Sequence, residues 1–297
     1  MLAHLITSKT RVCVFATPVV IFLTRHTHAN EGKAVFHMRK PQSELIGSSC
    51  AIRDIAEEIG CAARSDAKVL ITGESGVGKK VVAHMIHERS RRGQSRLVPI
   101  NCAGVPDSVL ESELFGHLRG SATGAHRDNL CWLEQAHGGT IFMDEIGEMS
   151  LYMQALLLRF LENGEIQRAG SDPTPSVVDV RVIAATSRSL LTRIAEKRFR
   201  EDLYYRLNMF HIPIPPLRER RDDIATLFSS FVRSYCRQHH VPEPVISEEV
   251  VARLMTYDWP GNVRELKNAA ERMVVRSRGA ITQADLPKDI FSSIQDN

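Results

Sequence analysis

The sequence predicts an α/β fold in which helices flank a parallel β-sheet, followed by a smaller domain built from helices. Up to about residue 221, short apolar runs typical of buried strands alternate with segments of helical periodicity. Several of these runs end directly at glycine or acidic residues, and ligands of parallel sheets bind beyond the carboxyl ends of the strands. From about residue 222 to residue 286 the pattern is helical only. We therefore expect a sheet domain with a ligand site and a smaller all-helical domain after it.

The composition favours a folded chain of the cytoplasm. The 297 residues are enough for one large domain or two modest ones, and 43% of them are hydrophobic, which predicts a buried core. A formal net charge of +3 is too small to argue for nucleic-acid binding by itself. The six cysteines form no C-x-x-C pair and no zinc-binding spacing. Reduced, unpaired thiols are the simpler interpretation.

Residues 1–43 carry a pattern that differs from the rest. The apolar run 12–23 follows Lys9 and Arg11 and resembles the core of a signal peptide, with a possible cleavage after Ala29. The run is too short to span a bilayer as a helix. Because the rest of the chain has the character of cytoplasmic machinery, we interpret residues 1–43 as a disordered leader or the result of a misplaced start, with Met38 as an alternative start.

The expected order of elements begins near Glu44. The expected strands are 68–72, the buried strand 96–101, 138–145 and a run that ends at Thr186. The expected helices are 50–64, 79–91, one near 108–116 and 151–163. A hairpin interrupted by two prolines is expected before the last strand. The sheet domain is thus expected over 44–221, the helical domain over 222–290 and a tail over 291–297.

A glycine loop follows the first expected strand. The stretch "GESGVGKK" fits the phosphate-loop pattern G-x-x-x-x-G-K-[ST] at Gly73, Gly78 and Lys79, but Lys80 stands where a Ser or Thr is usual. Glycines let backbone N–H groups wrap phosphate oxygens, and the N-terminus of the following helix adds partial positive charge. A plain glycine turn is the alternative, and the strand and helix on either side favour the phosphate loop.

Acidic and hydroxyl side chains follow two later strands. Asp144 and Glu145 end the run "TIFMDE", where an aspartate that binds magnesium and a carboxylate that orients or deprotonates water are expected. Taken alone, two such acids are ordinary surface residues, but the phosphate loop upstream favours the functional interpretation. Thr186 is a candidate sensor of the outer phosphate.

Three arginines complete the candidate set. Arg200 and Arg206 lie near the end of the sheet domain, and phosphoryl transfer gains from an arginine that a neighbouring subunit supplies. Helix salt bridges are the ordinary alternative for each. Arg264 lies in the first turn of a helix that is expected to start after Gly261, with Asn262 as its cap.

Long motifs, in order, carry a resemblance to a known family. They are "GESGVGKK", "NCAG", "SELFGH", "GSATGA", "EQAHGGTIFMDEIGEM", "GEIQRAG", "VRVIAAT", "FREDLYYRLN", "PPLRERRDDI" and "WPGNVRELKN". From about Glu44 to Ile290 the chain resembles the central domain of bacterial enhancer-binding proteins, the sigma-54-dependent transcription activators. The resemblance implies an AAA+ P-loop NTPase with a helical lid, a ring that is usually a hexamer, ATP and Mg²⁺ as cofactors, and the sigma-54 RNA polymerase holoenzyme as partner.

The resemblance also implies a role for individual residues. The nucleotide-binding set is Ile46 and Gly47 beside the adenine, the loop residues Gly73, Glu74, Ser75, Gly76, Val77, Gly78, Lys79 and Lys80, and Arg264 on the lid. The catalytic set is Asp144 for magnesium, Glu145 for the attacking water, Asn101 as its switch, Thr186 as first sensor, and Arg200 and Arg206 for the next subunit's ATP. Ser187 stands where the family more usually has Asn or His.

Two departures from the family pattern bear on activity. The family loop typically reads "GESGTGKE", so a missing hydroxyl at position 80 is ordinary, but a lysine there adds positive charge beside the phosphates. The loop that contacts the sigma factor is "GAFTGA" in the family, whereas here it is Gly120, Ser121, Ala122, Thr123, Gly124 and Ala125. Ala122 lacks the apolar face of the aromatic residue, a loss on the order of 2 kcal/mol of contact. We expect weakened sigma-54 binding.

No helix-turn-helix pattern follows "ADLPKDI" near the end of the sequence. DNA contact is therefore expected only indirectly or through a partner, and no membrane contact is expected. An ATP-driven activator is the first interpretation. The alternatives are an ATP-binding regulatory or co-assembly subunit, a truncated relative without a function, another AAA+ remodelling ATPase, or a soluble α/β domain with a fortuitous loop.

Overall fold

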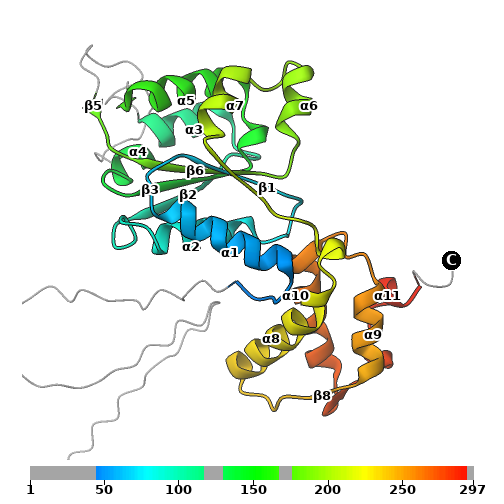
Figure 1. Ribbon diagram of the computed structural model, residues 1–297. Helices are drawn as coiled ribbons and strands as arrows, with labels where there is room; N and C mark the ends of the chain where they lie inside the picture. Colours follow the sequence, from blue (N-terminus) through cyan, green and yellow to red (C-terminus); the bar gives the residue numbers. More distant parts are fainter. Residues whose placement is uncertain (1–44, 117–129, 167–175, 293–297) are drawn as a thin grey trace, which may run out of the picture. The chain divides into compact units, whose positions relative to one another are not determined.

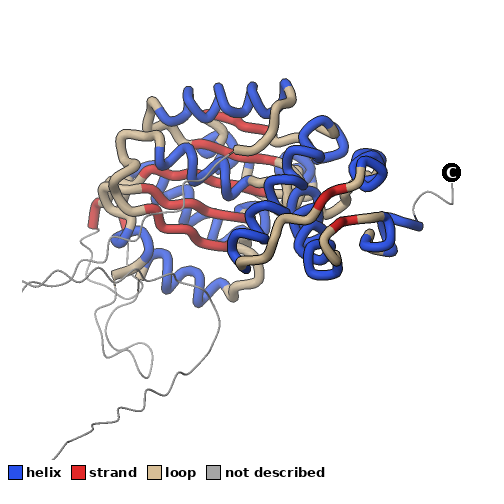
Figure 2. Tube along the Cα trace, turned by 90° about the horizontal axis from the view of Figure 1, so that it is seen from below, coloured by secondary structure: helices blue, strands red, loops and turns tan. Residues whose placement is uncertain are grey.

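A five-stranded parallel sheet organises the first part of the chain (Figures 1 and 2). The computed structural model describes residues 45–116, 130–166 and 176–292. The strands are β1 (Val69–Thr72), β2 (Leu97–Asn101), β3 (Thr140–Asp144), β6 (Arg181–Thr186) and β7 (Phe210–Pro213), in the spatial order β2-β3-β6-β1-β7. All four neighbouring pairs run parallel, so the predicted sheet class is confirmed. The leader 1–43 and the loop 120–125 lie outside the described residues.

Helices cover both faces of this sheet (Figure 1). One face packs against α1 (Cys50–Ala63) and α2 (Lys79–Glu88). The other face packs against α3 (Asp107–Phe115), α4 (Trp132–Gln135), α5 (Leu151–Asn163), α6 (Leu190–Ala195) and α7 (Glu201–Leu207). Side chains of β3 alternate between the two cores: Ile141 and Met143 join one, and Phe142 joins the other. A strand buried on both faces has no polar side to display, which is why residues 141–143 of β3 are continuously apolar before the final acid.

The sheet differs from the expectation at its edges. Strand β7 was not predicted: only Ile212 of its four residues is buried, which leaves little periodicity to detect. Strand β2 was predicted to be buried, but it is an edge strand with Pro99 and Asn101 exposed. Proline is tolerated at an edge because the missing N–H is not needed there. The expected hairpin before β6 is the two-residue pair β4 (Glu165–Ile166) and β5 (Ser176–Val177).

The lid has its own core of helices. Its elements are α8 (Asp222–His239), α9 (Glu248–Thr256), α10 (Asn262–Arg276) and α11 (Lys288–Ser292), and α10 packs along α8. Trp259 is fully buried in this core and donates from Nε1 to the Leu254 carbonyl at 2.8 Å. The expectation of helices only was wrong, because β8 (Val245–Ile246) pairs with β9 (Ala280–Ile281). Within the described ranges, no helix has both the length and the apolarity to cross a bilayer.

Three 3₁₀ turns complete the described elements. They are η1 (Ile146–Glu148), η2 (Leu217–Glu219) and η3 (Gln283–Asp285).

One buried carboxylate ties the start of the described chain to the lid. Asp223, in the first turn of α8, has no exposed surface. It accepts hydrogen bonds from the Ser48 N–H at 2.7 Å, the Ser49 N–H at 2.9 Å and the Ser49 hydroxyl at 2.7 Å. Gly47 leaves the necessary room, because a Cβ there would lie 2.8 Å from the same carboxylate. The segment that leads into α1 is therefore fixed against α8.

We predict that Asp223→Ala destabilises the fold by about 3 kcal/mol, since it removes a buried acceptor and leaves three part-buried donors without their partner. Asp222→Ala is the matched control: this neighbouring acid of the same helix turn is exposed and should change stability by only about 0.5 kcal/mol. Urea denaturation measures both. Equal losses in the two variants would contradict the anchoring role of Asp223.

Candidate functional site

The glycine loop joins β1 to α2 and lies under the lid. A Cβ on Gly73 would lie 2.6 Å from the carbonyl oxygen of Ile214, and a Cβ on Gly76 would collide with the carbonyl oxygen of Gly261. Both glycines also have positive φ, of 151° and 82°. The two positions therefore need glycine for conformation and for close approach. Gly78 precedes α2 and makes no side-chain cap, so the N-terminal end of this helix is suited to an anion.

Lys79 is a buried cation that holds the loop in shape. Its side chain is 6% exposed, and its Nζ donates to the carbonyl of Gly73 at 2.7 Å and of Glu74 at 3.0 Å. The same Nζ lies 3.7 Å from Oε1 of Glu145. Burial lowers the pKa of Lys79, while the carboxylates of Glu145 and Asp144 oppose that shift. A desolvated cation beside a ring of backbone groups is well placed to bind phosphate oxygens.

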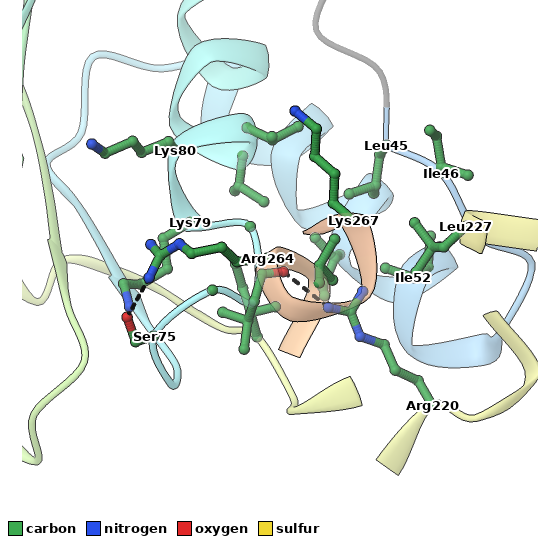
Figure 3. Close-up of a pocket in the computed structure, with 18 of the residues that line it drawn as sticks. Leu45, Ile46, Ile52, Ser75, Lys79, Lys80, Arg220, Leu227, Arg264 and Lys267 are labelled. Carbon is green, nitrogen blue, oxygen red and sulfur yellow. Dashed lines mark hydrogen bonds between the residues drawn. The ribbon is translucent and has the colours of Figure 1, made fainter. Parts of the chain in front are cut away.

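A cavity of about 640 Å³ opens beside the loop, within the size range of cofactor sites. One part of its lining is apolar: Leu45, Ile46, Ile52, Ile55, Leu227, Phe231 and Val263. The other part contains the loop residues 75–80, Asp144, Glu145, Arg264 and Lys267. Figure 3 shows the labelled apolar side chains on one side and Ser75, Lys79 and Lys80 on the other. The cavity can accept a flat apolar group next to a polyanion.

Asp144 is the last residue of β3 and lies at the rim of this cavity. Its Oδ1 accepts a hydrogen bond from the Glu145 N–H at 3.1 Å. Its Oδ2 lies 3.3 Å from Nζ of Lys80, the residue in the usual position of a Ser or Thr hydroxyl. The loop lysine and the strand aspartate are thus an ion pair.

Glu145 has a different partner. Its backbone adopts φ 55°, and its Oε2 accepts two hydrogen bonds from Ser187, from the N–H at 2.9 Å and from the hydroxyl at 2.7 Å. The expected switch Asn101 lies opposite Asp144 in the β2–β3 pair, but its Oδ1 accepts from the Ala103 N–H. Thr186 is fully buried and its Oγ1 accepts from the Arg188 N–H. In this arrangement Ser187, rather than Asn101 or Thr186, orients the Glu145 carboxylate.

The lid is connected to the loop by side-chain hydrogen bonds. Asn262 donates to Oε2 of Glu74 at 3.0 Å and to the carbonyl of Ser75 at 3.1 Å, and it accepts from the Leu217 N–H. The prediction that Asn262 caps α10 was wrong: Gly261 is the N-cap residue, and the Asn262 side chain is buried in this bridge. Arg264 donates to the Ser75 hydroxyl at 3.0 Å (Figure 3).

A second lid contact is an ion pair. Arg218 binds Glu74 with two hydrogen bonds, of 3.0 and 2.7 Å. The Arg218 guanidinium, followed by the Asn262 amide, lowers the pKa of Glu74 from 4.5 to about 2. Arg220 adds a buried contact, from Nη2 to the Val77 carbonyl at 2.9 Å.

The two remaining candidate arginines lie away from the cavity. Arg200 pairs with both oxygens of Asp202, at 3.0 and 2.7 Å, and Arg206 donates to the Leu161 carbonyl at 3.3 Å. The backbone N–H of Arg200 donates to the buried Gln154 side chain at 2.8 Å. Neither arginine is among the residues that line the cavity. They cannot act on a ligand of this chain's own cavity from these positions.

The residues present fit a nucleotide well and a magnesium ion less well. An apolar pocket, a glycine loop at a helix N-terminus and a buried lysine suit a nucleoside with phosphates. Mg²⁺ in such sites is typically bound by one or two carboxylates together with phosphates. Asp144 is the carboxylate available at this position, and it is shared with the Lys80 ammonium group.

Several residues of the site were not found from the sequence. Arg218 binds Glu74, Asp223 anchors the segment before α1, and Ser187 holds Glu145. Arg218 and Asp223 carried no signal of these roles, whereas Ser187 was noted as a departure from the family pattern. Glu74 and Asn262 were named from the sequence, but their contact with each other was not predicted. The cavity-lining part of the expected set is Ile46, Ser75, Gly76, Val77, Gly78, Lys79, Lys80, Asp144, Glu145 and Arg264. Gly47 packs against Asp223 instead.

We predict that Glu74→Gln lowers the stability by about 1 kcal/mol near neutral pH, a modest value because both partners are partly exposed. The folded-state pKa of Glu74 lies below the usual value of 4.5, so the ion pair stabilises the fold above that pH and the gain is lost as the pH falls toward 2. The difference between wild type and variant should therefore shrink below about pH 4.5. Urea denaturation from pH 7 to 3 measures it, with the exposed Glu58→Gln as control. A difference independent of pH would contradict the assignment.

Comparison with protein families agrees with this geometry. Residues 45–213 match the Sigma-54 interaction domain, and residues 218–297 match the AAA+ ATPase lid domain. The chain is 45% identical to the nitrogen fixation protein AnfA of Azotobacter vinelandii over 268 residues, which are 89% of this chain and 50% of AnfA. It is 46% identical to the transcriptional regulatory protein ZraR of Salmonella typhimurium over 88% of this chain and 62% of ZraR. The chain thus spans about half to three fifths of these relatives.

Solved structures lead to the same assignment. The fold is similar to NtrX from Brucella abortus in complex with ADP, with a TM-score of 0.78 and 35% identity over 86% of this chain and 57% of NtrX. The same protein in complex with ATP gives a TM-score of 0.77. The predicted fold class is therefore confirmed, and the chain belongs to the Sigma-54 interaction domain family of sigma-54-dependent transcriptional regulators, with an AAA+ ATPase-type domain and its lid.

Proposed function

We propose that this chain binds ATP in the cavity between the glycine loop and the lid, hydrolyses it within a ring of subunits, and thereby remodels the sigma-54 RNA polymerase. The observation that carries the proposal is the meeting of Lys79, Asp144 and Glu145 at one end of an apolar cavity. A cation for phosphates and a carboxylate beside it are the parts that phosphoryl transfer to water needs. Neighbouring structures of NtrX hold ADP and ATP, which supports nucleotide as the ligand.

The residues of the cavity have distinct roles in this proposal. Ile46 lies beside the base, the N-terminus of α2 and Lys79 bind the phosphates, and Arg264 reports nucleotide to the lid through its bond to Ser75. Glu145 orients the attacking water and accepts its proton. Mg²⁺, when bound at Asp144, would neutralise phosphate charge. Arg200 and Arg206 act on the ATP of the next subunit, in keeping with their distance from their own cavity.

A second candidate function is that of a regulatory or co-assembly subunit. It is favoured by Ala122 in the loop 120–125, where the family signature has an aromatic side chain. Such a subunit binds ATP and joins rings with a relative, but contacts sigma-54 weakly. The two functions differ only in whether this chain's own loop holds the sigma factor.

We predict that the native chain binds purified sigma-54 weakly in the presence of ADP and aluminium fluoride, and that Ala122→Phe binds on the order of tenfold more tightly, since it restores a large apolar contact. Co-sedimentation measures the complex. Tight binding by the native chain supports the activator and contradicts the weakened loop. Binding by the Phe variant alone supports the co-assembly subunit. Binding by neither variant contradicts the activator and the predicted effect of Ala122→Phe.

We further predict that Ser187→Ala lowers kcat for ATP hydrolysis by on the order of tenfold with little change in KM, because one of the two hydrogen bonds that hold Glu145 is lost. Ser187→Thr keeps the hydroxyl and should retain most of the activity. Ser189→Ala is the matched control: this hydroxyl caps α6, so its loss should lower stability by about 1 kcal/mol without a change in kcat. Glu145→Gln sets the floor of the assay. An unchanged kcat in Ser187→Ala would exclude the positioning role.

A further inference from the structure

The loop position that usually supplies a hydroxyl to the metal supplies a cation in this chain. In the general phosphate loop the residue after the lysine is a Ser or Thr whose hydroxyl binds magnesium. Here that residue is Lys80, the second residue of α2. A lysine cannot serve as a ligand in its charged form, because an ammonium group has three donors and no acceptor. Whatever Lys80 contributes at this position, it contributes as positive charge.

The structure places this charge on the acid that is expected to hold the metal. Nζ of Lys80 lies 3.3 Å from Oδ2 of Asp144, within ion-pair distance. The Lys80 side chain is 66% exposed and the Asp144 side chain 12% exposed. The lysine is therefore free to follow a ligand, whereas the aspartate is fixed at the end of β3. A cation on this carboxylate lowers its attraction for a second cation.

The rest of the cavity strengthens the effect. Its lining includes five cationic side chains and two carboxylates: Lys79, Lys80, Arg220, Arg264 and Lys267 against Asp144 and Glu145. Figure 3 labels all of these cations, with Lys79, Lys80 and Arg264 on the side of the loop. Positive charge thus exceeds negative charge before any ion binds. A polyphosphate without a metal is more strongly attracted to such a lining than a polyphosphate half-neutralised by Mg²⁺.

We propose that the Lys80 ammonium group supplies part of the charge that Mg²⁺ supplies in other phosphate loops, so that this chain binds ATP with little dependence on Mg²⁺. The inference rests on the proposed function, because it concerns the same nucleotide site. It applies to binding, and it assigns Lys80 as the residue that sets the metal dependence.

The test is the affinity for ATP with and without the metal. Isothermal titration calorimetry gives the Kd of the full chain for ATP in EDTA and in excess Mg²⁺. The readout is the Kd in EDTA divided by the Kd in excess Mg²⁺. For the native chain we expect a ratio within about threefold of one. For Lys80→Gln we expect the ratio to rise on the order of tenfold, since the loss of a single close charge at intermediate dielectric accounts for about that factor. For Lys80→Glu, which changes the charge by two units, we expect a larger rise. Because the Lys80 side chain is largely exposed, we expect both variants to fold like the native chain, and a melting curve checks this directly.

The matched control is Lys267→Gln. Lys267 lines the same cavity from α10, and its Nζ lies 3.9 Å from Glu271 rather than at Asp144. Its loss should weaken ATP binding by a similar factor with and without Mg²⁺, which leaves the ratio unchanged. If the ratio rises in Lys267→Gln as it does in the Lys80 variants, the total charge of the cavity sets the metal dependence. That result would overturn the specific role of Lys80.

The outcomes separate this inference from the proposed function. If the native chain binds ATP only with Mg²⁺, or if Lys80→Glu leaves the ratio unchanged, the inference is wrong and ATP binding stands. If no variant and no condition gives ATP binding, the proposed function fails as well.

Discussion

The parallel alignment of β3, β6 and β1 is the constraint on which the site depends. Because the strands run in one direction, their carboxyl ends lie at one edge, with Thr72 level with Thr186 and Asn101 level with Asp144. Three parts of the site therefore lie close together at the carboxyl ends of neighbouring strands. They are the glycine loop after β1, the two acids at the end of β3 and Ser187 after β6. These strands are buried on both faces, so the positions of their carboxyl ends are set by the apolar core and not by the polar side chains of the site.

The lid adds a second constraint through a small number of polar contacts. Asn262, Arg218 and Arg220 all bind the loop region 74–77, through Glu74, Ser75 and Val77. A movement of the lid relative to the loop must break or rotate these hydrogen bonds. A change in the conformation of residues 74–77 therefore alters the contacts of the lid. Asp223 has the same effect on the other side, because it fixes the segment that brings Leu45 and Ile46 to the cavity. The cavity is thus built from parts that are distant in sequence and joined by hydrogen bonds that range from exposed to buried.

The strength of the local sequence pattern explains which parts of the structure were predicted and which were not. Strands buried on both faces and amphipathic helices leave long periodic signals, so β1, β3, α1 and α5 were predicted close to their observed bounds, and the end of β6 was predicted at Thr186. Strand β7 and the pair β8–β9 have too few buried residues for such a signal. Asparagine is a common residue type at helix N-caps. Here, however, Asn262 has a φ of 52° and a buried side chain that contacts Glu74 and Leu217, which are distant in sequence. Pairings across the chain, such as Ser187 with Glu145, need the strand order, which no local pattern contains.

The two neighbouring acids show how this framework divides chemical roles between similar groups. Asp144 and Glu145 are adjacent in sequence, yet Asp144 pairs with the exposed Lys80, whereas Glu145 accepts two hydrogen bonds from Ser187 and lies 3.7 Å from the buried Lys79. The Lys80 ammonium group competes with other cations for Asp144, whereas the two short hydrogen bonds from Ser187 fix the direction of Glu145. The left-handed backbone at Glu145 turns its side chain toward β6 and away from its neighbour. The side chains at positions 80 and 187 therefore contact different carboxylates, so a substitution at one position removes no contact made by the other.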